Sequence, residues 1–204
     1  MADNENQTAL GVVRAVHGDE SAELIRLFSV FDDLQYVLRC CEHLVTALAA
    51  PDQGPARVDT DDALVEALWT GALVGYARCF SDESKVLTEA DLAGLETDGD
   101  ATFFHRSTIM LRNHFVSRDT NPRETVTIGA AEDDAGRPAG VAIVAIPTPT
   151  VNSATVRLVG RIAYGLSGLI DERIQSSQRR VLAAAEELPA QEFTKLPELH
   201  LADT

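Results

Sequence analysis

This chain has few of the sequence features on which disulfide-stabilised and membrane-spanning proteins depend. Aromatic residues make up only 5% of its 204 residues, so the core must rest on Leu, Val, Ile and Ala. The three cysteines (Cys40, Cys41 and Cys79) are odd in number and show no CxxC spacing. This argues against a disulfide framework or a zinc site and favours buried thiols in the reducing cytoplasm. No apolar run approaches about 18 residues and the first residues are polar, so we expect neither a membrane span nor a signal peptide.

Positive charge is scarce as well. The chain has 17 Lys and Arg against 32 Asp and Glu, a net charge of −15. Nucleic-acid-binding proteins usually carry a basic face, because neutralising phosphates supplies much of their affinity. RNA is therefore a disfavoured partner, and the acidity is best explained by solubility. The sequence also lacks GxGxxG, Walker A, HExxH and GxSxG motifs, so we expect no cofactor and no metal.

What the chain does have is a helical periodicity. Apolar residues recur every three or four positions in four segments, which predicts four long helices. The first begins at Asp19 or Ser21 and ends near Ala50, and the second follows the acidic stretch at 59–62 and runs to Phe80. The third starts near Asp100 and ends before Pro122, with its buried side at Phe104, Thr108, Leu111 and Phe115. The fourth begins at Asn152 or Ser153 and stops before Pro189.

Between the third and fourth helices, the spacing of the apolar residues changes from that of a helix to that of β-strands. β-branched residues alternate at 124–129 and recur at 141–146, and turn residues lie between them at 133–138. This predicts a β-hairpin at about 124–147, lying on the helical body. The fold class is thus mainly α: an up-and-down bundle of about four long helices with one hairpin inserted before the last. We expect a flexible arm at 1–18, containing a short ordered piece at 10–16, a single domain at 19–188 and a tail at 189–204.

The largest group of chemically functional side chains lies along the third predicted helix and extends to its end. Arg112, His114 and Arg118 are the candidate catalytic residues, because arginine binds phosphate bidentately and histidine transfers protons near neutral pH. The candidate substrate-binding residues are His105, Arg106, Asn113 and Asp119. Together they would suit metal-free RNA cleavage. Arginines at a helix end also complement the helix dipole, and side chains like these are more often ion-paired than catalytic.

Two segments carry a family resemblance. The block Ala67–Phe80 and the block Arg112–Asp119, followed by a hairpin and a final helix, resemble little-characterised bacterial proteins of the HEPN-like helical-bundle group over about 64–188. The resemblance implies a helical bundle that dimerises and, in active members, an Arg-x4–6-His motif that cleaves RNA without metal. Arg112 matches the motif arginine and Asn113 its polar second position. Arg118 stands where the histidine should be, which removes the proton-transfer group.

Three functions follow. The first is a HEPN-like helical protein, non-catalytic or weakly active, that acts as a homodimer and through a protein partner. The second is a metal-independent ribonuclease that uses Arg112 with His114 or His105. The third is a regulatory protein with a small-ligand pocket at Trp69, Tyr76 and Phe104. The missing motif histidine and the net charge favour the first, so we do not expect an enzyme.

Overall fold

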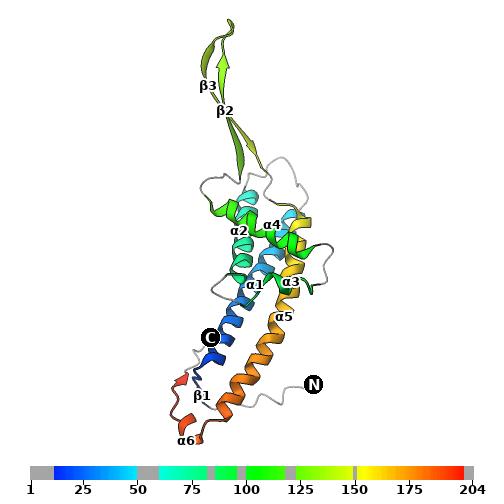
Figure 1. The fold of residues 1–204 in the computed structure, drawn as a ribbon. Helices are drawn as coiled ribbons and strands as arrows, with labels where there is room; N and C mark the ends of the chain where they lie inside the picture. Colours follow the sequence, from blue (N-terminus) through cyan, green and yellow to red (C-terminus); the bar gives the residue numbers. More distant parts are fainter. Residues whose placement is uncertain are drawn as a thin grey trace, which may run out of the picture. The chain divides into compact units, whose positions relative to one another are not determined.

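The chain is mainly helical, with two small two-stranded sheets (Figure 1). The computed structural model describes residues 12–49, 60–81, 86–95, 100–117, 123–148 and 151–199. Within these ranges the helices are α1 (Asp19–Ala49), α2 (Thr60–Cys79), α3 (Glu89–Leu92), α4 (Ala101–Val116), α5 (Ser153–Glu186) and α6 (Ala190–Phe193). The strands are β1 (Val13–Arg14), β2 (Glu124–Glu132), β3 (Pro138–Pro147) and β4 (Glu198–Leu199). The four long predicted helices are therefore present, as is the hairpin at the predicted residues.

The chain divides into two compact units. One unit contains Met1–Phe28 and Asp171–Thr204, and the other contains Ser29–Ile170. The division passes through α1 and α5, so each of these long helices contributes to both units.

The smaller unit joins segments that are distant in sequence. β1 pairs antiparallel with β4, and the guanidinium of Arg14 donates to the carbonyl oxygen of Leu196 at 2.8 Å and to the carboxylate of Glu198 at 3.1 Å. Arg180 of α5 also forms an ion pair with Glu23 of α1 at 2.7 Å. β1 lies inside the ordered piece expected at 10–16, whereas β4 lies in the segment expected to be a tail.

The larger unit has an aliphatic core with one large cluster of aromatic side chains. Trp69 and Tyr76 of α2 are almost fully buried, as are the main apolar residues of α1 and α5 (Leu34, Val37, Leu44, Val156, Val159, Ile162, Leu166 and Ile170). The buried residues of α5 recur every three or four positions, as its helical periodicity predicts. In α1 the buried positions include Leu27 and Val30, whereas Phe28 is exposed.

All three cysteines are buried as thiols and form no disulfide, as expected. Desolvation raises the pKa of the Cys41 thiol to about 12, and burial raises that of Cys79 to about 12 as well. Thiols with such pKa values stay protonated at neutral pH, so they act as small core side chains.

Close helix packing depends on particular glycines. A Cβ atom added at Gly165 of α5 would lie 2.9 Å from Cδ2 of Leu95, and one added at Gly75 of α2 would lie 3.1 Å from Cγ2 of Val37. Gly168 has open space around it. Gly165 of α5 therefore lies close to Leu95, which is outside the helices, whereas Gly168 has no close neighbour.

The hairpin is a two-stranded ribbon (Figure 1) with nine cross-strand pairs, from Glu124 opposite Pro147 to Glu132 opposite Pro138, and its register shifts between Ala131 and Glu132. The carboxylate of Asp133 accepts hydrogen bonds from the backbone N–H groups of Ala135 and Arg137, both at 2.9 Å, which fixes the turn. Almost every residue of both strands is exposed. The expectation that the hairpin lies on the helical body was wrong. Since β3 is apolar at consecutive positions from Val141 to Ile146, its pattern does not mark one face for burial.

Candidate functional site

The candidate residues lie along α4, whose start is fixed by Asp100. The carboxylate of Asp100 accepts a hydrogen bond from the backbone N–H of Phe103 at 3.0 Å, which caps the helix where the sequence predicted its start. The helix ends at Val116 with Ser117 as its C-cap. Arg118 and Asp119 lie outside the described residues, so the candidate site is described only from His105 to His114.

His105 points into the core of the larger unit. It is 6% exposed, and its Nδ1 atom lies 3.1 Å from the hydroxyl oxygen of Tyr76 on α2. Its ring centroid lies 4.3 Å from that of Phe80. Desolvation is the main reason that the pKa of His105 is lowered, so the ring is neutral at pH 7. His105 is thus a hydrogen-bonded core histidine, and the structure does not bring it to an exposed substrate site.

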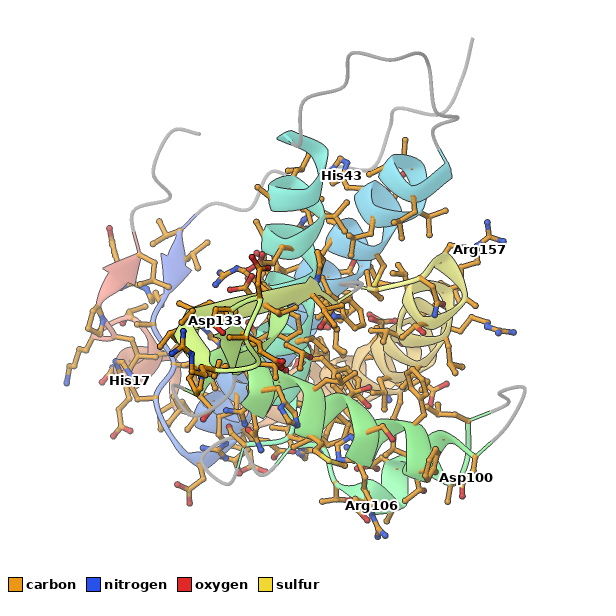
Figure 2. The ribbon with its side chains drawn as sticks, turned by 90° about the horizontal axis from the view of Figure 1, so that it is seen from above. His17, His43, Asp100, Arg106, Asp133 and Arg157 are labelled. Carbon is orange, nitrogen blue, oxygen red and sulfur yellow. The ribbon has the colours of Figure 1, made fainter. Side chains whose placement is uncertain are left out.

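Arg106 is held by an acid of the same unit. Its Nε donates to Oε1 of Glu89 at 3.2 Å and its Nη2 donates to Oε2 at 2.7 Å. This two-point pair lowers the pKa of the Glu89 carboxyl, chiefly through the hydrogen bond, and raises the pKa of Arg106 in return. The side chain points outward from α4 (Figure 2), but its hydrogen-bonding edge is occupied. The pair joins α4 to α3.

Arg112 and His114 lie on different sides of α4. Each residue of an α-helix is rotated by about 100° around the helix axis, so residues two positions apart, such as Arg112 and His114, point about 200° apart. Arg112 is half-buried, and its Nε is buried without a hydrogen-bond partner among the described residues. Asn113 and His114 are exposed. The structure therefore does not bring the predicted catalytic arginine and histidine together.

The side of α4 that carries His114 presents exposed apolar residues together with Ser107. Phe103 is 70% exposed, Met110 lies seven residues further along the same side, and His114 lies four residues beyond Met110. Leu111, which was expected to be buried, is exposed. The expected burial is confirmed at Thr108, and His105 lies on the same buried side. Sequence patterns missed this because they treated the histidine as a site residue.

A second candidate site is a groove between α1 and α5 that the sequence did not predict. It encloses about 880 Å³ and has an apolar floor that includes Leu38, Val45 and Val156. Arg157 and Tyr164 of α5 also line it, and Figure 2 shows Arg157 pointing outward from that helix. Trp69 and Tyr76, which were expected to line a ligand pocket, are packed in the core. The signal that could have indicated the groove is the pair Arg157 and Arg161, one turn apart on α5.

No described helix has the length and apolar character needed to cross a membrane. In the same ranges, no three His, Cys, Asp or Glu side chains gather in a way that could hold a metal ion. Comparison with protein-family models, curated proteins and solved structures gives no match to this chain.

Proposed function

We propose that this chain is a non-catalytic helical protein that acts through self-association and contact with protein partners. The proposal includes the HEPN-like resemblance and an up-and-down arrangement of α1, α2, α4 and α5. The observation that carries it is the placement of the candidate residues on α4, where His105 is in the core and Arg106 is paired with Glu89.

Metal-free RNA cleavage makes geometric demands that this arrangement does not meet. A base, an acid and a phosphate-binding group must come within hydrogen-bonding reach of one substrate. Arg112 and His114 lie on different sides of α4, and His105 is enclosed by Tyr76 and Phe80. A net charge of −15 further opposes the approach of RNA.

Exposed apolar surface supports an interaction role. Phe103 and Met110 on α4 are exposed, and so are the β-branched side chains of the hairpin. Contiguous exposed apolar surface on a folded protein commonly marks a protein contact.

The test of the non-catalytic part is an RNA cleavage assay with chelator present, comparing the wild type with Arg112→Ala. We expect neither protein to cleave a panel of single-stranded and hairpin RNAs. Cleavage by the wild type that is lost in Arg112→Ala, while the circular dichroism spectrum is unchanged, would establish a ribonuclease and overturn the proposal.

The groove between α1 and α5 supports a second function, the binding of a small amphipathic anion. Its volume of about 880 Å³ lies in the range of small-molecule sites and most of its lining is apolar. Arg157 and Arg161 supply two positive charges against the one carboxylate of Glu42. Calorimetric titration with medium-chain carboxylates tests this function. Binding that weakens about tenfold in Arg157→Ala would support it, as expected for loss of a charged contact, and the absence of heat with every carboxylate would count against it.

A further inference from the structure

The two faces of the β2–β3 hairpin differ in composition. Residues directly opposite one another in an antiparallel pair share a face, and alternate residues along a strand do the same. Three cross-strand pairs, Val126 with Ala145, Ile128 with Ile143 and Ala130 with Val141, therefore form one face. All six side chains are apolar, and we call this surface the apolar hairpin face. The opposite face carries Thr125 and Thr127 opposite Ile146 and Val144.

The apolar hairpin face is open to solvent along its length. Ile128 is 62% exposed, Ile143 is 71% exposed and Val141 is 77% exposed. Exposing so much β-branched surface is unfavourable, because burial of apolar area is the main force that stabilises folded proteins. A two-stranded hairpin is also marginally stable in water unless further strands or a helix cover an apolar face. The hairpin thus has the composition of a sheet whose apolar face is normally packed against further strands or a helix.

Charge distribution indicates which partner fits. No charged residue occurs at 125–131 or at 139–146, whereas the chain as a whole carries a net charge of −15. Two copies of so acidic a chain repel each other over most of their surface, and this repulsion is weakest where both present an uncharged face. The tip of the hairpin carries Glu132, Asp133 and Asp134 against Arg137, which is itself paired with Asp133 at 3.1 Å. An acidic tip disfavours insertion into an anionic lipid surface.

We propose that the apolar hairpin face packs against the same face of a second copy of this chain. This inference rests on the self-association proposed above and names the surface that would mediate it. Face-to-face packing of two hairpins supplies the missing cover and makes a small two-layer sandwich about 10 Å thick. The Ile128–Ile143 pair lies at the middle of the face, so it contributes most to the contact.

The size of the face sets the strength of the dimer. The three pairs of the apolar hairpin face span five positions, or about 17 Å, and two strands span about 10 Å, so this face covers about 170 Å² of flat area. Stable specific interfaces bury about 800 Å² per partner. The hairpin contact is therefore much smaller than a standard interface, and we expect a weak, reversible dimer.

Sedimentation equilibrium of the full chain between about 1 and about 200 µM tests the proposal, a range that brackets micromolar association. The test variant is Ile128→Thr/Ile143→Thr, which keeps β-branched side chains in the strands and removes the apolar character of the centre. The matched control is Val144→Thr/Ile146→Thr on the opposite face. A second control, Phe103→Ser/Met110→Ser, changes the exposed apolar side of α4. Circular dichroism of each variant verifies that the helices are retained.

We expect the wild type and both controls to dimerise, and the dissociation constant of the test variant to rise by about tenfold or more, as for the loss of central contacts in an interface. As a second readout, Ile143→Cys should form a disulfide-linked dimer on mild oxidation and Val144→Cys should not. Equal dissociation constants for the wild type and Ile128→Thr/Ile143→Thr would overturn the hairpin contact and leave self-association intact. A wild type that is monomeric at every concentration would overturn both. Binding of the wild type to anionic phosphatidylserine vesicles that is lost in Ile128→Thr/Ile143→Thr would overturn the hairpin contact.

Discussion

The Nδ1 atom of His105 on α4 lies 3.1 Å from the hydroxyl oxygen of Tyr76 on α2, inside the core of the larger unit. Burial raises the pKa of Tyr76 and lowers that of His105, so both side chains are neutral. The tyrosine keeps its proton and can donate it to Nδ1, which leaves the ring proton of His105 on Nε2. This buried pair joins two helices that the sequence associates with different motifs.

Replacing Tyr76 with phenylalanine should destabilise the protein. Tyr76→Phe keeps the ring contacts but leaves Nδ1 of a buried histidine without its partner, which costs about 1–3 kcal/mol. Urea unfolding followed by circular dichroism measures the loss. The control is Tyr164→Phe, which removes a hydroxyl from an exposed ring on α5 and should change the free energy of unfolding little. Equal stability of wild type and Tyr76→Phe would show that the bond contributes nothing.

The pH dependence of stability should carry the signature of His105. Its pKa is lowered in the folded state, so between that value and the unfolded value of about 6.5 the unfolded chain binds more protons. The contribution of His105 to the free energy of unfolding is therefore fully present above about pH 6.5. It is lost as the pH falls from about 6.5 to the pKa of His105 in the folded state. In His105→Gln this component should be absent. Urea unfolding at several pH values would contradict the assignment if both proteins lost stability in parallel across that window.

The cap of α4 can be tested separately from its side chains. Asp100→Ala should lower the free energy of unfolding by about 1 kcal/mol, because the backbone N–H of Phe103 loses its acceptor. Asp100→Asn keeps an oxygen at the same position and should behave nearly as the wild type does. A loss of the same size in both variants would mean that the carboxylate acts by its charge rather than as a cap.

Two glycines in long helices should respond in opposite directions to alanine. Gly168→Ala adds a methyl group in open space on α5 and should stabilise the protein by about 1 kcal/mol through helix propensity. Gly75→Ala places Cβ 3.1 Å from Val37 and 3.2 Å from Tyr36, so α1 must shift and the protein should lose stability. Thermal unfolding of both variants checks this. Stabilisation by both would mean that α1 and α2 are not in close contact at Gly75.

Much of the helical structure could be predicted because it is encoded locally. The stripe from Val156 to Ile174 on α5, the cap at Asp100 and the turn residues around Asp133 each act within a few positions of the chain. The pairing of β1 with β4 could not be predicted, since it joins Arg14 to Glu198 across nearly the whole sequence. Two-residue strands leave no periodic pattern.

The candidate site was harder to predict for a related reason. A histidine has the same appearance in a sequence whether it faces solvent or a tyrosine, and the partner of His105 is 29 residues away on another helix. The ion pair of Arg106 with Glu89 also joins separate elements. The sequence indicated which residues have useful chemistry. Only their three-dimensional placement shows that His105 and Arg106 are paired with Tyr76 and Glu89 and that Arg112 and His114 lie on different sides of α4.

The central claim is that this chain works by associating rather than by catalysis, and its most direct test is the mass of the wild type in solution. Sedimentation velocity across a concentration series at physiological salt should show an average mass that rises from that of one chain toward twice that value. A mass that stays at that of one chain at every concentration would contradict the account.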